Sequence, residues 1–218
     1  MTHRDVVMPG RPDDSPGDSP SDAKGILGGI DLLSRAVLYT HATLRPVSVD
    51  LLSRPTPCRN WDLQTLLGHM DDALLAFTDA AEIGYVDVHT MWGSGARDRA
   101  GELVGRLEAR ACALLDAWQA NRRGRGIVVG DRALSPELVA ATGALEIAVH
   151  GWDVAQACGT RLPIPATLAA DLLTIAPLLV KNADRPAMFA AAIDVHLGAG
   201  PAAQLLGFLG RQEPTATR

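Results

Sequence analysis

Apolar residues recur along most of the chain at the spacing of an amphipathic α-helix. The stretches that show this pattern are separated by segments rich in proline and glycine. The pattern predicts four long helices followed by two shorter ones, at about 23–44, 61–83, 97–121, 135–159, 165–182 and 201–209. Helices with one apolar face must bury that face against one another, so a helical bundle is expected.

Local signals refine the expected helix ends. Ser21 or Asp22, then Asn60, then Ser135 are the expected N-cap residues of the first, second and fourth helices. Pro177 is expected to kink or shorten the fifth helix, because proline lacks a backbone N–H.

The chain shows no repeats and no strand-like alternation of apolar and polar residues. Residues 84–96 are expected to be a loop, and 127–129 a short extended piece followed by a turn at 130–132. The predicted fold class is all-α, a four-helix bundle with extra short helices and long connections. Residues 1–22 are rich in Pro, Asp, Ser and Gly and predict a disordered tail. The domain is then 23–212, with a short tail at 213–218.

Composition narrows the class of protein. Hydrophobic residues make up 47% and charged residues 21% of the chain, as in a globular domain, while only 4% are aromatic. A net charge of -5 argues against nucleic acid as a partner. No apolar run reaches the roughly 20 residues that span a bilayer, so no membrane partner is expected. The three cysteines have no framework spacing, and the N-terminus lacks a signal-peptide pattern. Both features predict a cytoplasmic protein with reduced thiols.

Glu146 and His150 are the first candidates for site chemistry. They lie four residues apart in an apolar helix, so they share one helical face. His69 falls on or beside the apolar stripe of the second helix and can supply a third ligand. Two histidines and a glutamate are a common catalytic zinc set that leaves one position open. Spacing alone also allows a surface Glu–His pair and a core histidine without a metal.

Three blocks of sequence resemble the DinB-like four-helix-bundle superfamily, and within it the group that includes mycothiol-dependent maleylpyruvate isomerase. The blocks are Thr56-Pro57-Cys58-Arg59-Asn60-Trp61-Asp62-Leu63 with Leu66-Leu67-Gly68-His69, then Glu146-Ile147-Ala148-Val149-His150-Gly151-Trp152-Asp153, and Gln204-Leu205-Leu206-Gly207-Phe208-Leu209-Gly210-Arg211. The third block is similar to the end of a single-domain subgroup described as metal-binding. The resemblance covers roughly residues 24–212 and indicates an actinobacterial source.

The resemblance implies that His69, Glu146 and His150 are metal ligands. It implies a metal-dependent thiol S-transferase or thiol-assisted isomerase that uses mycothiol and a small electrophilic substrate. The expected metal is Zn²⁺, because thiol transfer needs no redox change, with Ni²⁺ or Fe²⁺ as alternatives. The isomerase has a further C-terminal domain for which this chain is too short, so the substrate is expected to differ. A tailoring enzyme of specialised metabolism and a non-catalytic metal- or small-molecule-binding module are the alternatives, as a monomer or homodimer.

Other residues near these blocks have less defined roles. Asp153 either orients His150 or anchors its helix to the backbone of the loop 56–61, and the second interpretation is favoured. Cys58 is expected to pack as a small apolar side chain. Cys158 is not expected to reach the cavity. Arg211 is expected to be solvated, with contact to an anionic substrate as the alternative. Three histidines are not expected to be ligands, namely His41, His89 and His196. The arginine cluster at 122–125 is expected to be solvated.

Overall fold

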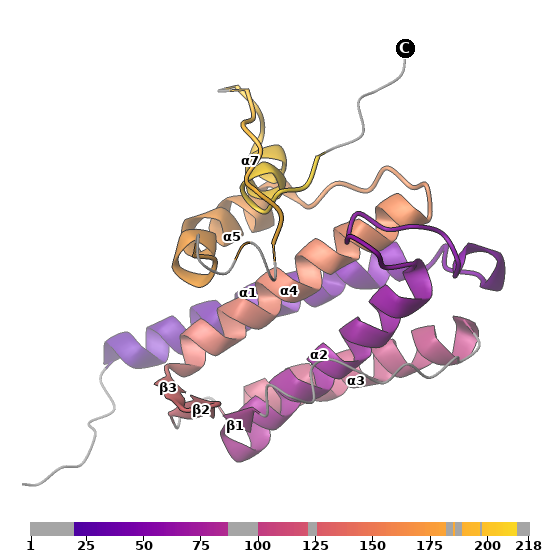
Figure 1. Cartoon of the computed structure of the whole chain (residues 1–218). Coiled ribbons are helices and arrows are strands. Elements are labelled where there is room, and N and C mark those ends of the chain that lie inside the picture. Colours follow the sequence, from indigo (N-terminus) through magenta and orange to yellow (C-terminus); the bar gives the residue numbers. More distant parts are fainter. Residues whose placement is uncertain are drawn as a thin grey trace, which may run out of the picture.

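The computed structural model describes residues 20–86, 100–121, 126–181, 185, 189–196 and 198–212, with the backbone alone for 20–27. Four long helices form a bundle (Figure 1): α1 (Pro20–Leu44), α2 (Leu63–Ile83), α3 (Ala100–Ala120) and α4 (Pro136–Ala157). Helix α1 packs along α4 and α2 packs along α3, with further contacts of α2 with α4 and of α1 with α3. The predicted all-α bundle is confirmed. The tail segments 1–19 and 213–218 lie outside the described residues.

The ends of three long helices test the expected caps. Ser135 caps α4 as predicted, because its hydroxyl accepts the backbone N–H of Leu138. The prediction of Asn60 as the cap of α2 is wrong. Asn60 takes a left-handed φ of 66° in the preceding turn, and Asp62 accepts the backbone N–H of Thr65 at 2.8 Å. Helix α1 begins at Pro20, so the expected caps at 21 and 22 lie inside it.

A small three-stranded sheet closes one end of the bundle (Figure 1). Strands β2 (Ile127–Val129) and β3 (Arg132–Leu134) form an antiparallel hairpin, and β1 (Tyr85–Val86) pairs with β2 in parallel. The extended piece and turn predicted at 127–132 are therefore confirmed. The loop predicted at 84–96 is wrong at β1, and its part 87–96 lies outside the described residues. A 3₁₀ turn, η1 (Val49–Leu51), lies between α1 and α2.

Two further helices, α5 (Ala166–Leu179) and α7 (Pro201–Phe208), pack together on the side of α1 and α4 away from α2 and α3 (Figure 1). Pro177 lies inside α5, which ends two residues later rather than near residue 182. The missing N–H of Pro177 removes a backbone hydrogen bond and accounts for this early end. No described helix is long and apolar enough to cross a lipid bilayer.

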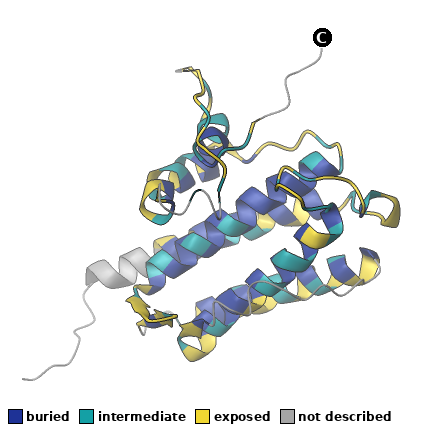
Figure 2. Ribbon diagram, viewed as in Figure 1, coloured by how far each residue is buried: buried dark blue, intermediate teal, exposed yellow. Residues whose placement is uncertain are grey.

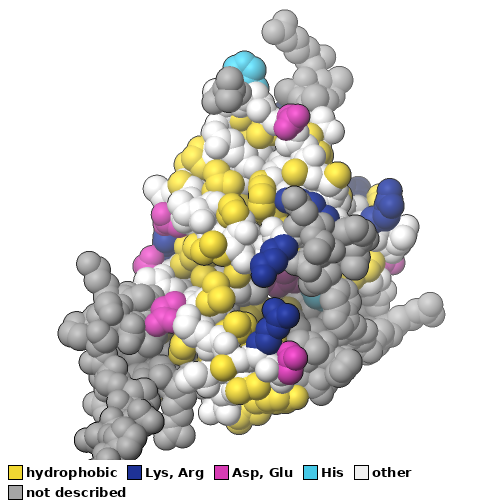
Figure 3. All heavy atoms as spheres, turned by 60° about the vertical axis from the view of Figure 1, so that its left-hand side comes forward, with side chains coloured by type: hydrophobic (Ala, Val, Ile, Leu, Met, Phe, Trp, Pro, Cys, Tyr) yellow, Lys and Arg dark blue, Asp and Glu magenta, His cyan; other side chains and the backbone are white. Residues whose placement is uncertain are grey.

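Helix α4 is the most enclosed element, because it is buried on nearly all sides (Figure 2). Its crossing with α1 is close because glycines stand at the contact. A Cβ on Gly151 would clash with the hydroxyl of Thr40, and a Cβ on Gly143 would lie 3.4 Å from Leu33 of α1. The Thr40 hydroxyl donates to the backbone carbonyl of Ile147 at 2.8 Å. This contact fixes the middle of α4, which carries Glu146 and His150. On the face drawn in Figure 3, charged side chains of both signs lie among hydrophobic ones.

Candidate metal centre

The three predicted ligands come together between α2 and α4. The Nε2 atom of His69, on α2, lies 2.7 Å from Oε1 of Glu146. The Nε2 atom of His150, one turn along α4, lies 3.0 Å from the same oxygen. His150 is buried, while His69 and Glu146 are partly exposed. The i, i+4 geometry of α4 and the inward stripe of α2 thus place three ligand-type side chains on one point.

An aromatic ring covers this group. Trp61, from the loop before α2, lies 4.9 Å from the ring of His69 and 6.3 Å from that of His150, measured between centroids. The two imidazoles meet edge to face at 5.0 Å. Contact with the indole restricts both rings and limits water at the ligand atoms.

Asp153 fixes the orientation of His150. Its Oδ2 lies 3.0 Å from Nδ1 of His150, and a carboxylate can only accept, so Nδ1 carries the proton. The other nitrogen, Nε2, is then the one that faces Glu146 and can bind a cation. The favoured expectation, in which Asp153 anchors the loop 56–61 through its backbone, is wrong. Asp153 lies one turn past His150 on the same face and binds side chains.

Arg211 is the partner of Asp153 that sequence reasoning missed. Its Nε donates to Oδ1 at 2.9 Å and its terminal nitrogen to Oδ2 at 2.8 Å, while the Asp153 side chain is 0% exposed. Burial alone would raise the pKa of Asp153, but Arg211 and His150 lower it from 3.8 to about 2. Gly210, at φ 75°, turns the chain so that Arg211 points inward. The closing Gly-Arg pair was the only signal in the sequence.

Cys58 packs against the hydrophobic core as predicted, and its thiol also belongs to this polar group. Its Sγ donates to Oδ2 of Asp153 at 3.2 Å and lies 3.6 Å from Arg211 and 3.7 Å from Nδ1 of His150. The loop 56–61 turns Cys58 inward through Thr56, whose hydroxyl accepts the Cys58 N–H at 3.2 Å. Asp153 is thus held by its own helix and by two segments that are distant in sequence.

The described residues contain two groups with ligand-type atoms within 4.8 Å of one another. The first is His69, Glu146 and His150, and the second joins Cys58 and Asp153 to His150. In the second group Arg211 already supplies the positive charge. In the first group the acid lies between two imidazoles, at 2.7 and 3.0 Å. The donor set, and the carboxylate on the far nitrogen of His150, are the pattern that ligating histidines show. These residues fit a divalent metal.

Burial and neighbouring charges shift the pKa values of Glu146 and His150 in opposite directions. Burial raises the pKa of Glu146, but the charge of His150 and hydrogen bonds from both histidines outweigh it, so this pKa lies well below its usual range. Burial lowers the pKa of His150, yet Glu146 and the hydrogen bond to Asp153 hold it well above the usual range. The carboxylate is therefore ionised, and its positive partner is the His150 imidazole, whose place a bound cation can take.

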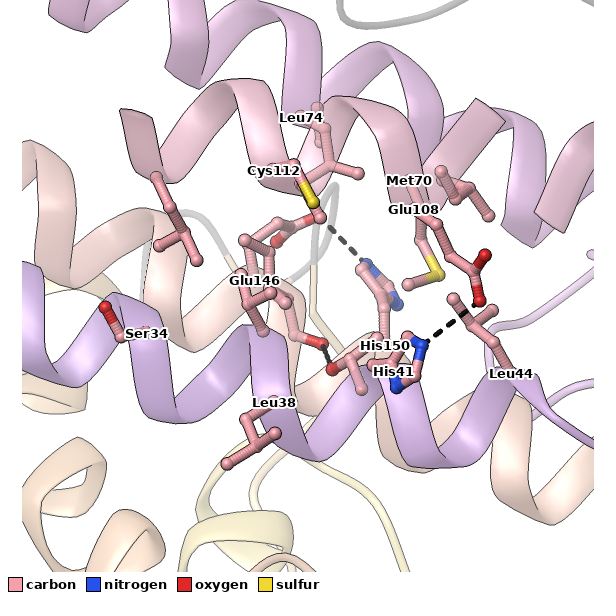
Figure 4. Close-up of a pocket in the computed structure, with 17 residues that line it drawn as sticks. Ser34, Leu38, His41, Leu44, Met70, Leu74, Glu108, Cys112, Glu146 and His150 are labelled. Carbon is pink, nitrogen blue, oxygen red and sulfur yellow. Dashed lines mark hydrogen bonds and ion pairs between the residues drawn. The ribbon is translucent and has the colours of Figure 1, made fainter. Parts of the chain in front are cut away.

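A cavity of about 550 Å³ extends from this group between α1, α2, α3 and α4 (Figure 4). Glu146 and His150 contribute to its inner end. Its mouth lies between α1 and α3, where Leu38, His41 and Cys112 are exposed. His41 on α1 and Glu108 on α3 meet across the mouth at 3.2 Å (Figure 4).

The remaining candidates take no part in the ligand group. His41 pairs with Glu108, and His196 is exposed and accepts the N–H of Gly198. His89 and the arginine cluster 122–125 lie outside the described residues. Cys158 follows the last turn of α4, away from the cavity lining, and burial raises the pKa of its thiol. All three cysteines, Cys58, Cys112 and Cys158, are free.

A four-helix bundle with two histidines and a glutamate converging at the inner end of a cavity defines a DinB-like protein. The chain belongs to the mycothiol maleylpyruvate isomerase N-terminal domain family, whose family model matches residues 33–155. The resemblance predicted from the sequence blocks is confirmed.

Two solved structures are similar to this chain. They are the mycothiol-dependent maleylpyruvate isomerase and a histidine-to-alanine mutant of that enzyme, with TM-scores of 0.53 and 0.52. Each is 16% identical to this chain, and the match covers 67% of this chain and 68% of the other. This similarity shows the shared fold. A comparison with curated protein sequences gives no match.

Proposed function

We propose that this protein is a metal-dependent enzyme of thiol transfer or thiol-assisted isomerisation, with mycothiol as cosubstrate and a small electrophile as substrate. The observation that carries the proposal is the convergence of His69, Glu146 and His150 at the inner end of a cavity large enough for a small molecule. The family relationship supports thiol dependence in general. Three protein ligands leave a position open for a further molecule.

In this proposal His69 Nε2, Glu146 Oε1 and His150 Nε2 hold one divalent metal. When bound, such a metal lowers the pKa of a thiol that occupies the open position and so favours the nucleophilic thiolate at neutral pH. Zn²⁺ is the preferred metal because thiol transfer involves no redox change, and Ni²⁺ and Fe²⁺ suit the same ligands.

The surrounding residues prepare the ligands. Asp153 keeps the proton of His150 on Nδ1, so Nε2 stays available as a ligand. Arg211 donates to Asp153 at 2.8 Å and so compensates the charge of this buried carboxylate. Trp61 packs on both imidazoles and limits access of water. A cytoplasmic location is part of the proposal and rests on the free thiols, which persist in a reducing compartment.

The first test is the metal content of protein purified without an affinity tag. We expect about one divalent metal per chain, and its loss in His69→Ala. His41→Ala is the matched control, because His41 also lines the cavity but pairs with Glu108. Retention of the metal in His69→Ala, or equal loss in both variants, would contradict the ligand set.

The second test is turnover of mycothiol with a panel of electrophiles. The wild-type protein should consume the thiol, and His69→Ala should not. Protein that holds its metal but turns over no thiol with any electrophile would be a non-catalytic binding module instead.

A further inference from the structure

The charge of the cavity carries information about the substrate. Among the lining residues, all of which lie in described helices, the ionisable groups are two acids and two histidines, apart from the Cys112 thiol, with no Lys or Arg. Glu146 and His150 lie at the inner end, and Glu108 and His41 at the mouth. A ligand with two carboxylates would meet the bound metal at one end only. Its second carboxylate would lie in the cavity without a cationic partner, and burial of an unpaired charge is unfavourable.

Arginines on the neighbouring helices are bound elsewhere. Arg106 and Arg110 share helix α3 with the cavity wall, but both bind the buried carboxylate of Asp71, at 2.9 and 2.6 Å. Arg211 binds Asp153 behind His150. These three side chains are paired with buried acids, and none of them lines the cavity.

The walls between the two ends are hydrophobic. Met70 and Leu74 of α2, Leu107 and Leu115 of α3, and Ile147 of α4 contribute their side chains. Four of these five are buried, so these apolar walls lie inside the bundle. The volume of about 550 Å³ falls within the roughly 300–1,000 Å³ of cavities that bind small molecules.

We infer that the substrate is an uncharged electrophile with a hydrophobic body, and that a dicarboxylate does not fit this cavity. This inference rests on the proposed function, because it assigns the reacting end of the molecule to the ligand group. The hydrophobic body extends from Glu146 and His150 toward the mouth between α1 and α3. The solved relatives are named for maleylpyruvate, a compound of different charge, so the inference separates this chain from them.

The test is binding of a neutral fluorescent probe, N-phenyl-1-naphthylamine, to the metal-loaded protein. Ala111 lines the cavity, so Ala111→Phe fills it and should weaken probe binding about tenfold or more. Ala109→Phe is the matched control, because Ala109 is exposed on the same helix and does not line the cavity. An uncharged enone with an alkyl chain should displace the probe, and maleate should not. Displacement by maleate, or equal probe binding in both variants, would overturn the inference.

A second measurement needs no variant. Cys112 is exposed at the mouth, so bound enone should slow its alkylation by N-ethylmaleimide several-fold, measured by peptide mass spectrometry at early times. Cys158, which does not line the cavity, is the internal control. An alkylation rate of Cys112 that is the same with and without saturating enone would also overturn the inference.

These measurements separate the two proposals. Probe binding requires no thiol, so intact binding without mycothiol turnover would count against the proposed function while supporting the ligand class. Turnover of a dicarboxylate at a rate similar to that of the neutral enone would support the function and overturn the ligand class.

Discussion

Each end of the cavity holds a histidine and a glutamate at a similar distance, but the two pairs differ in burial and in further partners. At the inner end His150 and Glu146 lie 3.0 Å apart, with His69 and Asp153 as further partners. At the mouth His41 and Glu108 lie 3.2 Å apart, and both side chains are nearly half exposed. Among the described residues no third ligand-type side chain joins the pair at the mouth. Residue type and distance therefore do not distinguish the two ends. The inner end differs by a third ligand-type side chain, by burial, and by a partner that fixes the histidine tautomer.

The largest difference between the two ends of the cavity is expected from substitution of Asp153. Asp153→Asn removes the charge that compensates Arg211 and should lower the free energy of unfolding by about 3 kcal/mol or more. Affinity for the metal should fall about 10- to 100-fold, because the amide no longer fixes the proton on Nδ1 of His150 as firmly. Denaturant unfolding and competitive metal titration measure the two effects.

The control for Asp153→Asn is Asp171→Asn. Asp171 binds Arg35 at 2.7 Å, but on the surface, so the expected change in the free energy of unfolding is below about 1 kcal/mol. Similar losses in both variants would mean that burial of the inner group does not matter.

A medium effect is expected where α1 crosses α4. In Gly151→Ala the new Cβ would lie 3.1 Å from Cβ of Thr40, so the helices must separate at a cost of about 1–3 kcal/mol. Gly151 follows His150, so affinity for the metal should fall as well. Gly105 lies at an exposed position of α3, where an added Cβ would have no heavy atom within 4 Å. Gly105→Ala should therefore raise the free energy of unfolding by about 0.5–1 kcal/mol. Thermal and denaturant unfolding should show these opposite signs, and two changes of the same sign would contradict the close contact.

The smallest effect is expected at the mouth. Glu108→Gln breaks an exposed pair with His41, so the free energy of unfolding should change by less than about 1 kcal/mol. The metal content should stay at the wild-type value, because Glu108 is not a proposed ligand. A loss of stability or metal as large as in Asp153→Asn would remove the distinction between the two ends of the cavity.

Features that depend on local spacing could be predicted from the sequence. The 3.6-residue period located α1 to α4, and the same period placed Glu146 and His150 on one face and His69 on the facing stripe. The cap of α2 was predicted two residues too early, because Asn60 and Asp62 are both good caps by type. Only the left-handed backbone of Asn60 decides between them.

The remainder of the site depends on contacts between distant segments. Arg211 lies 58 residues from Asp153, and Cys58 lies 95 residues from it, with no periodic relation between them. The cavity depends on which side chains leave the space between helices unfilled, such as Ala73 and Ala111 among larger neighbours. A pattern of apolar and polar positions records which face is buried, but not how completely that face is packed.

The contact of Arg211 with Asp153 also sets the order in which the site can mature during synthesis. Helix α4 leaves the ribosome with His150 and Asp153 in place, but the arginine follows 58 residues later. At a synthesis rate of about 5–20 residues per second, Arg211 is added several seconds after Asp153. Arg211 then completes the group of side chains around Asp153, so binding of the proposed metal is expected to occur late in synthesis.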